Sequence, residues 1–267
     1  MNEKEIGSLL PGIVKIARQA GKQILAVYET DFEVRTKADA SPLTAADLAA
    51  HDTIVAGLKK LTPGWPVLSE ESAEIAFETR SRWSRYWLVD PLDGTREFVK
   101  RNGEFTVNIA LIDDHCPVLG VVHVPVSGRD YYASRQSGAW RQDSGEEPVS
   151  IQASPRCSRP VRVVGSKSHR GSSLDAFLER LGDYQLVPMG SSLKICLVAD
   201  GSADIYPRLG PTSEWDTAAA QAVVEIAGGK MTNIDGEAIQ YNRKADLLNP
   251  FFLVFGDSSV DWPRLLK

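Results

Sequence analysis

The hydrophobic pattern of this 267-residue chain changes along its length, and it limits the possible folds more than any other feature. Apolar residues recur at helical spacing through the first 60 residues, interrupted by a polar segment at 36–44 that predicts a loop. Short β-rich runs follow over 67–151, and strand-like and helix-like segments alternate beyond them. We therefore expect an antiparallel α+β half at 1–155 and an α/β half at 156–267, packed as one compact unit.

The same periodicity predicts the individual elements. Pro11 suits the start of the first helix, and Thr44-Ala-Ala-Asp47 resembles a capping box at the start of the second. A hairpin is expected where 113–117 joins two β-rich runs. The predicted helices are 11–27, 44–61, 173–181, 192–199 and 217–227, and the predicted strands are 67–68, 86–90, 105–112, 118–126, 131–133, 139–141, 161–164, 204–206 and 251–255.

Composition narrows the class of protein. The chain has 30 Lys and Arg against 35 Asp and Glu, a formal net charge of −5, which argues against a broad basic surface for a nucleic-acid polymer but not against a small anionic substrate. The sequence contains no apolar run of about 18 residues, so we expect no transmembrane helix. The N-terminus shows no secretory signal. Three widely spaced cysteines favour a reducing compartment. We expect a cytoplasmic location; peripheral association with the inner face of the cell membrane and the oligomeric state stay open.

The segment WLVDPLDGT at 87–95 is the most informative part of the sequence. An apolar strand delivers Asp90 at its end, where Pro91, which has no N–H, is expected to stop the strand. Asp93 follows on a turn that Gly94 can adopt. Two carboxylates this close repel each other unless a divalent cation lies between them, and Mg²⁺ prefers carboxylate and carbonyl oxygens. The alternative is an Asx-rich turn in which Asp93 caps a short helix, and spacing alone does not separate the two.

Acidic residues also occur at three other notable places. Glu70 and Glu71 end an apolar strand. Asp216 leads into an Ala-rich helix, and Asp47 occupies the third helical position after its cap. Each has a purely structural explanation, because carboxylates at a loop start are ordinarily solvated and Asp in a first helical turn commonly caps the helix. None of these residues alone indicates a site.

Other catalytic schemes lack their sequence signatures. A cysteine phosphatase needs Arg six residues after its Cys, and the corresponding residues are Val122, Val163 and Ser202. An aspartyl-phosphate enzyme of the D-x-D-G-T type needs Asp where Pro91 stands. The absence of G-x-x-x-x-G-K-[ST], C-x-x-C and H-E-x-x-H argues against a P-loop NTPase and a zinc enzyme.

Taken together, three acidic segments resemble the motifs of the inositol monophosphatase superfamily: Glu70-Glu71, Asp90-Pro-Leu-Asp93-Gly94-Thr95 and Glu214-Trp-Asp216-Thr-Ala-Ala. Their order and spacing match over nearly the whole chain. Three further segments are similar to one branch, the CysQ-type 3′(2′),5′-bisphosphate nucleotidases: 101–108, 190–194 and 206–212. The resemblance implies a layered α+β and α/β sandwich of α-β-α-β-α type, like inositol monophosphatase and fructose bisphosphatase.

The resemblance also implies roles for individual residues. The ligands of two or three Mg²⁺ ions would be the side chains of Glu70, Asp90, Asp93 and Asp216 and the carbonyl oxygen of Leu92. The residues that orient the attacking water would be Asp47, Glu70 and Thr95. The substrate-binding residues would be Gly94, Thr95, His169, Ser191, Lys194, Arg208 and Asp216. By residue type alone, Lys194 on a helix is expected to be solvated, and a lone His is expected to be structural.

The implied function is a lithium-sensitive, Mg²⁺-dependent phosphatase that hydrolyses the 3′-phosphate of adenosine 3′,5′-bisphosphate to AMP and phosphate, linked to sulfate assimilation. One alternative is an inositol monophosphatase or another sugar-phosphate phosphatase. An alternative of another class is a non-catalytic metal or nucleotide sensor. Against the sensor, Asp47 and Thr95 are needed for water activation rather than for binding. The expected partner is a small nucleotide bisphosphate, with no nucleic-acid polymer.

Overall fold

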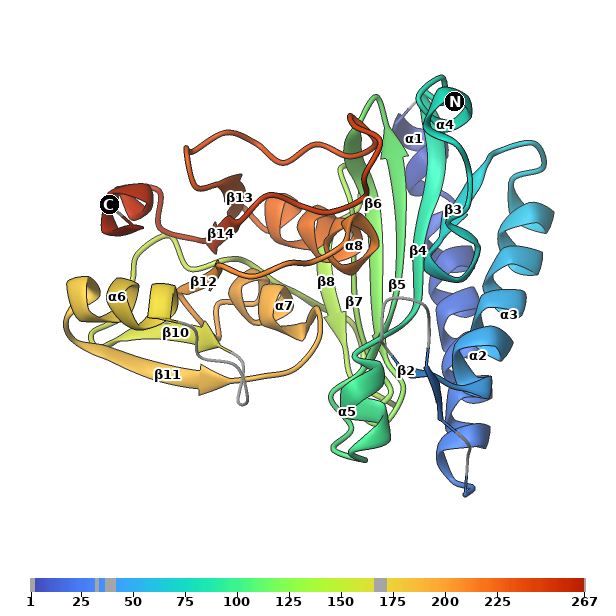
Figure 1. Cartoon of the computed structure of the whole chain (residues 1–267), viewed down its shortest axis with the longest axis horizontal. Helices are drawn as coiled ribbons and strands as arrows, with labels where there is room; N and C mark the ends of the chain where they lie inside the picture. Colours follow the sequence, from blue (N-terminus) through green and yellow to red (C-terminus); the bar gives the residue numbers. More distant parts are fainter. Residues whose placement is uncertain (1–2, 32–33, 37–41, 166–171, 267) are drawn as a thin grey trace.

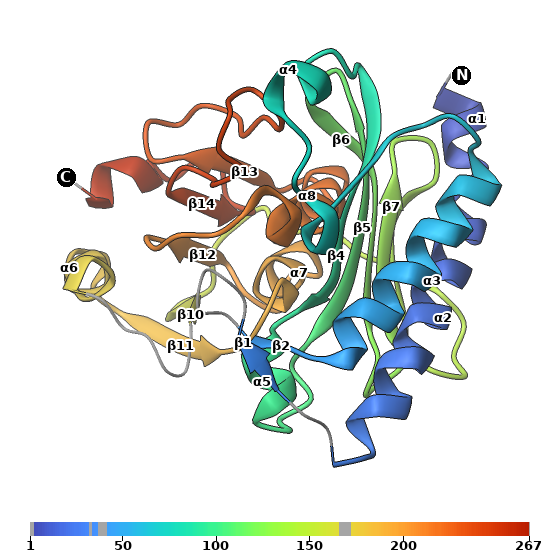
Figure 2. The same ribbon diagram turned by 45° about the vertical axis from the view of Figure 1, so that its right-hand side comes forward.

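The computed structural model describes residues 3–31, 34–36, 42–165 and 172–266, apart from the side chains of residues 35, 36, 42 and 43. Its elements form five layers, which are seen from two directions in Figures 1 and 2. In order, the layers are helices α2 (Leu10–Tyr28) and α3 (Ala45–Leu61), a seven-stranded sheet, helices α7 (Leu193–Ala199) and α8 (Glu214–Ile226), a five-stranded sheet, and α6 (Ser172–Leu181) with the 3-10 helix η2 (Trp262–Leu266). The predicted α-β-α-β-α fold class is confirmed.

The seven-stranded sheet follows chain order from one edge to the other. Its first two strands are parallel, and all the other neighbouring pairs are antiparallel, including the predicted hairpin of β5 and β6. The strands are β3 (Val67–Ser69), β4 (Arg85–Asp93), β5 (Thr106–Asp113), β6 (Cys116–Val124), β7 (Arg129–Ser134), β8 (Gly138–Gln142) and β9 (Val149–Ser150).

The five-stranded sheet has the order β11-β10-β12-β14-β13. Its strands are β10 (Val161–Gly165), β11 (Tyr184–Pro188), β12 (Ile205–Arg208), β13 (Lys230–Asn233) and β14 (Phe252–Phe255). Sequence reasoning missed β11 and β13, the two edge strands. Both are short, and β11 has no fully buried residue, so neither presents the apolar run by which strands are recognised.

The remaining elements are short. They are α1 (Glu3–Gly7), α4 (Phe77–Arg80), α5 (Thr95–Val99), the 3-10 helix η1 (Glu70–Ser72), and the paired two-residue strands β1 (Arg35–Thr36) and β2 (Pro42–Leu43). This pair corrects the prediction of a loop over 36–44, because both ends of that segment join a small antiparallel ladder; residues 37–41 lie outside the described residues. Among the helices that the structure describes, none has the length and apolar character needed to cross a membrane.

Alternation along the strands directs polar residues into the space between the two sheets. On β4, Trp87 and Val89 pack in the core under α2 and α3, whereas Leu88 belongs to the core around α7 and α8. Because side chains alternate along a strand, Asp90 follows Leu88 toward α7 and α8. On β12 the same rule places Arg208 on the face of Tyr206, which lies in the same middle core. The ends of strands from both sheets therefore present charged side chains where α7 and α8 begin.

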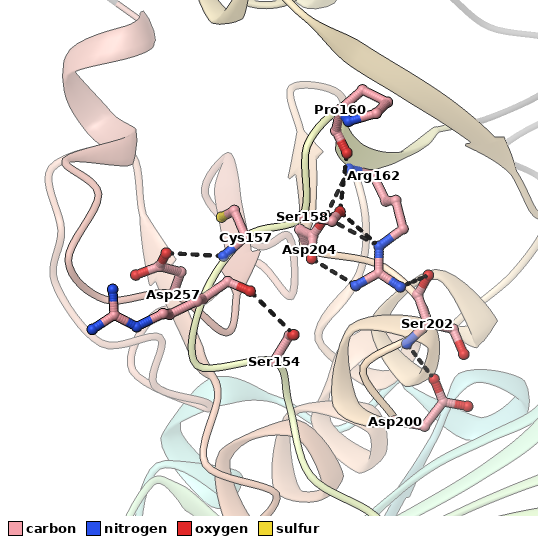
Figure 3. Close-up of polar contacts among 10 residues, drawn as sticks. Ser154, Cys157, Ser158, Pro160, Arg162, Asp200, Ser202, Asp204 and Asp257 are labelled. Atoms are coloured by element: carbon pink, nitrogen blue, oxygen red, sulfur yellow. Dashed lines mark hydrogen bonds and ion pairs between the residues drawn. The ribbon is translucent and has the colours of Figure 1, made fainter.

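A buried ionic network around Asp204 fastens the five-stranded sheet to the segment that enters it (Figure 3). The Asp204 carboxylate accepts hydrogen bonds from the backbone N–H and the guanidinium of Arg162, both at 2.7 Å, and from the Ser158 hydroxyl. Arg162 also donates to the carbonyl oxygen of Ser202 at 3.0 Å. Burial by itself would raise the pKa of Asp204, but the hydrogen bonds from Arg162 and Ser158 outweigh it and hold this pKa below its usual range.

Candidate active site

Strand β4 does not end at Pro91, as the sequence predicted, but continues to Asp93. Its pairing with β5 shifts between Asp90, which lies opposite Asn108, and Asp93, which lies opposite Thr106. Two residues of β4 therefore face a single residue of β5 in a β-bulge, where Pro91 is tolerated because a bulged residue needs no ladder hydrogen bond. Residues three apart on a regular strand point to opposite faces. The bulge is what lets Asp90 and Asp93 reach the same space.

Asp93 is held in place by the start of α7, from the other half of the chain. Its Oδ2 accepts the backbone N–H of Ser192 at 2.5 Å and lies 3.4 Å from the hydroxyl of Thr106. The Ser192 hydroxyl in turn donates to Asn108 Oδ1 at 2.9 Å. Sequence reasoning missed these three supporting residues. The available signal was the pair of polar residues at alternate positions of β5, an otherwise apolar strand.

Asp216 reaches the same space from the first turn of α8. It forms a capping box with Ser213, whose backbone N–H donates to Asp216 Oδ2 at 2.9 Å. Carboxylate oxygens of Asp90, Asp93 and Asp216 nevertheless all lie within 4.8 Å of one another. The structural role of Asp216 as a cap and its membership of an acidic cluster are therefore both true, because its two oxygens can serve different partners.

The acidic cluster is electrostatically unfavourable without a cation. Burial raises the pKa of Asp90 well above its usual range, and the nearby charges of Glu70, Asp93 and Asp216 raise it further. Burial together with the charge of Asp93 raises the pKa of Asp216 to about 8. Burial also raises the pKa of Asp93, although Lys194 opposes this rise. A hard divalent cation binds carboxylate oxygens and would cancel their mutual repulsion, so this partly buried cluster is suited to such a cation.

Glu70 begins η1 at the end of β3 and lies beside this cluster. Its side chain is half-buried and faces Asp90, whose pKa it raises through its charge and a hydrogen bond. The alternative explanation of Glu70 as a solvated acid at a loop start therefore does not describe its surroundings. β3 pairs in parallel with β4, so the two strands end at the same edge of the sheet.

Asp47 and Thr95 meet near the end of β4. Asp47 is buried in the first turn of α3, where the predicted capping box with Thr44 is present. Thr95 begins α5, and its hydroxyl lies 3.5 Å from Asp47 Oδ1 and 3.3 Å from the carbonyl oxygen of Leu92. The structure thus brings together three of the residues that sequence analysis assigned to the site.

Gly94 makes the turn that connects the bulge to α5. Its φ is +90°, in the left-handed region that side chains disfavour, and a Cβ there would lie 3.1 Å from the carbonyl oxygen of Glu104. The position therefore requires glycine for two separate reasons. The backbone N–H groups of Gly94 and Thr95 open α5 next to the acidic cluster.

A cavity of about 240 Å³ adjoins the acidic cluster, and its lining includes four cationic residues, Arg96, Lys100, Lys194 and Arg208. Lys194 is only 8% exposed, so the expectation that it would be solvated is wrong. Burial lowers its pKa to about 8, and its Nζ lies 5.7 Å from the centroid of the Tyr206 ring. Ser191 also lines this cavity. His169, the remaining predicted contact, lies outside the described residues.

Comparison with known proteins agrees with this geometry. Residues 7–255 match the model of the inositol monophosphatase family. The chain is 50% identical over 248 residues to the 3′(2′),5′-bisphosphate nucleotidase CysQ of Salmonella typhimurium, covering 92% of this chain and 99% of that protein. It is 37% identical to the protein of the same name from Haemophilus influenzae, over 97% of both chains. The crystal structure of CysQ from Bacteroides thetaiotaomicron superposes with a TM-score of 0.79 at 41% identity, covering 91% of this chain and 95% of that one. The chain belongs to the inositol monophosphatase family.

Proposed function

We propose that this chain is a Mg²⁺-dependent phosphatase that hydrolyses the 3′-phosphate of adenosine 3′,5′-bisphosphate to AMP and phosphate. The observation that carries the proposal is the cavity beside the acidic cluster, in which Lys194 and Arg208 offer positive charge next to Asp93 and Asp216. A substrate with two phosphates needs both regions, one for the reacting phosphate and one for the other. The relatives named as bisphosphate nucleotidases support the same substrate.

The acidic residues are suited to hold the metal ions. Two or three Mg²⁺ ions would be held by the carboxylates of Glu70, Asp90, Asp93 and Asp216 and by the carbonyl oxygen of Leu92. When bound, Mg²⁺ supplies positive charge to the phosphate and lowers the pKa of a coordinated water. This donor set consists only of oxygen, which is the preference of Mg²⁺.

The chain's own residues would position the reactants. Asp47, Glu70 and Thr95 would orient the attacking water, and the Thr95 hydroxyl contacts both Asp47 Oδ1 and the Leu92 carbonyl oxygen. The N–H groups of Gly94 and Thr95 would hold the scissile phosphate at the start of α5. The water oxygen would attack phosphorus as the bond from phosphorus to the 3′-oxygen breaks; one proton of the water ends on the 3′-oxygen, which leaves as a hydroxyl, and the other stays with the phosphate.

The other phosphate would lie beside Lys194 and Arg208 in this cavity. Arg208 can bind it through its planar guanidinium, which already donates to the carbonyl oxygen of Pro211 at 2.7 Å, and Lys194 adds a point charge. Ser191 would contact the nucleotide from the turn before α7. His169 is a further proposed contact that rests on the sequence resemblance alone.

Two alternatives are weaker. An inositol monophosphatase has a single substrate phosphate and no need for a second cationic region, and the relatives compared above are named nucleotidases. A non-catalytic sensor has no need for the contact between Asp47 and Thr95, which serves water activation. We also propose a cytoplasmic location, which suits the three cysteines, all of them free thiols.

A substrate panel with and without Mg²⁺ tests the proposal. The purified chain should hydrolyse adenosine 3′,5′-bisphosphate with kcat/KM at least about 10-fold above that for inositol 1-phosphate, and chelation of Mg²⁺ should abolish both activities.

Asp93→Asn should lower turnover roughly 100-fold or more while the circular dichroism spectrum stays unchanged, because it weakens the charge held at the metal site. Preference for inositol phosphate, or full activity in chelator, would overturn the proposal.

A further inference from the structure

The connection between β13 and β14 crosses from the five-stranded sheet to the seven-stranded sheet and returns along the start of α8 (Figure 1). Its returning part pairs with the residues that precede α8: Leu248 forms an antiparallel bridge with Ser213. On either side of the bridge, the N–H of Glu214 donates to the Leu247 carbonyl oxygen, and the N–H of Asn249 donates to the Thr212 carbonyl oxygen, both at 2.8 Å. The segment 247–249 therefore satisfies backbone groups at the entry to α8.

The side chain of Asn249 adds a second set of bonds at the same place. It is 8% exposed, and its Nδ2 donates to the Ser213 carbonyl oxygen at 2.7 Å and to the Thr217 hydroxyl at 3.0 Å. A third, longer contact of 3.3 Å reaches the Thr212 hydroxyl. Thr212 and Ser213 precede α8, and Thr217 is its fourth residue, so the amide of Asn249 contacts both ends of the first turn.

All the side-chain hydrogen bonds of Asn249 that the structure describes are donated by its Nδ2. The Asn249 Oδ1 is buried and accepts no hydrogen bond from the residues that the structure describes. A buried acceptor without a partner lowers stability, so the hydrogen bonds that this side chain contributes are those of its donors. The amide cannot be reversed, since that would point Oδ1 at the carbonyl oxygen of Ser213.

Asp216 sits inside this turn, one residue before Thr217. Its carboxylate must stay close to those of Asp90 and Asp93, which come from the other sheet and repel it. The capping bond from the Ser213 N–H to Asp216 sets the side chain relative to the turn, but it does not set the turn relative to the sheet. The bonds from Asn249 tie the turn to the 247–249 segment, which leads toward β14 of the five-stranded sheet, so they hold the turn from the side away from Asp90 and Asp93.

We propose that Asn249 is a positioning residue for the metal site: it fixes the first turn of α8 so that Asp216 is preorganised beside Asp90 and Asp93. The inference rests on the proposed role of Asp216 as a metal ligand. Residues that orient metal ligands typically contribute about 10-fold to 100-fold in metal affinity. Loss of Asn249 should therefore weaken metal binding even where the protein stays folded.

Binding of Mn²⁺, followed by electron paramagnetic resonance on the metal-free full chain, tests this without an activity assay. Asn249→Ala should weaken Mn²⁺ binding about 10-fold. Asn233→Ala is the matched control: it removes an Asn that also makes three turn hydrogen bonds, on β13 away from the site, and should leave Mn²⁺ binding unchanged. Thermal unfolding of each variant reports its stability. If Asn249→Ala does not fold, Asn249→Ser, which keeps one donor, takes its place.

Asn249→Asp separates positioning from simple charge. It keeps the shape but loses the donors, and it adds a negative charge near the cluster. A purely electrostatic site would bind Mn²⁺ more tightly, whereas a misplaced Asp216 binds it more weakly, which is the result we expect. Equal Mn²⁺ affinity in the wild type and Asn249→Ala would overturn the role of Asn249. Absence of Mn²⁺ binding by the wild type would instead overturn the proposed metal site and this inference with it.

Discussion

Lys194 shows how far the surroundings of one residue can depart from its type. A lysine on a helix ordinarily extends into water, yet this side chain is almost entirely buried between α7 and β12, above the Tyr206 ring. The charges of Asp93, Glu97 and Asp216 favour its protonated form and so partly offset the effect of burial on its pKa. A desolvated ammonium next to a cavity is well placed to bind an anion, because it has little water to lose.

Replacing Lys194 with alanine should therefore affect the second phosphate. A hydrogen bond to a charged group contributes about 1.5–3 kcal/mol, so Lys194→Ala should raise KM for adenosine 3′,5′-bisphosphate by roughly 10-fold or more. KM for a monophosphate substrate should change little. Steady-state kinetics on both substrates measures this, with Lys15→Ala on the exposed face of α2 as the control. An unchanged bisphosphate KM would remove Lys194 from the substrate site.

The ion pair of Asp204 with Arg162 is expected to affect the free energy of unfolding rather than the activity. Its folded-state pKa is depressed, so its carboxylate stabilises the fold above the unfolded-state pKa of about 3.9, and this contribution is lost as the pH falls through the folded-state value. Asp204→Asn should lower the free energy of unfolding by about 3 kcal/mol at pH 7, since it leaves Arg162 without its buried partner.

The difference between wild type and Asp204→Asn should shrink in acid. Urea unfolding at pH 7 and at pH values below about 4 measures it. Glu3→Gln, which removes an exposed ion pair with Arg135, is the control and should leave stability nearly unchanged at every pH. A difference that stays constant with pH would show that the ionised form of Asp204 is not what stabilises the network.

At the scale of elements, α8 owes its place to a close backbone approach. Gly120 of β6 lies against the helix, and a Cβ there would lie 2.1 Å from the carbonyl oxygen of Ala219. The nearest atoms are backbone atoms of Ala219, so a side chain at position 120 could not be accommodated by moving a flexible neighbour. The seven-stranded sheet therefore sets the depth of α8, and with it the position of Asp216 at the start of the helix.

Gly120→Ala should push α8 outward. Overpacking of this kind costs about 1–3 kcal/mol, and the displaced helix should also bind Mn²⁺ more weakly. Gly12→Ala is the comparison, because a Cβ there meets only the flexible Leu61 side chain at 3.3 Å and alanine favours a helix. Chemical unfolding and Mn²⁺ titration of both variants test this. Wild-type stability in Gly120→Ala would mean that the helix yields without cost.

At the scale of the molecule, the acidic cluster joins the seven-stranded sheet to the helix layer between the two sheets. Asp90 and Asp93 belong to β4, whereas Asp216 belongs to the helix layer that covers the five-stranded sheet. The three carboxylates repel one another when no cation is present, which destabilises the assembled fold. A bound metal should therefore act as a staple between distant parts of the chain.

Metal should raise the melting temperature for this reason. Mg²⁺ at about 100 times its dissociation constant adds about 2.7 kcal/mol, or roughly 5–10 °C for a chain of this size. Asp216→Asn should melt higher than the wild type in chelator, because one repelling charge is gone, and should gain little from Mg²⁺. Differential scanning calorimetry in Mg²⁺ and in chelator measures both effects. An equal melting temperature of the wild type in Mg²⁺ and in chelator would contradict the role of the metal in linking β4 to α8.

Much of the architecture was predictable from the sequence, because helical and strand periodicities are local properties of the chain. The capping box of Thr44 and Asp47, the β5–β6 hairpin and the acidic segment of β4 all follow from residues close together in sequence. One expectation that failed was also local in origin. Pro91 was expected to end its strand, and a bulge instead accommodates it, since pairing with β5 resumes at Asp93.

The sequence by itself determined which residues are acidic, which strands are buried and which turns require glycine. Only the tertiary structure decided that Asp216 meets Asp90 and Asp93, that Ser192 donates to Asp93, that Asn249 holds the start of α8, and that Lys194 is buried. The physical reason is that each of these contacts joins elements far apart in the chain. Their meeting depends on how two sheets pack around α7 and α8, and no periodicity within a single element encodes that packing.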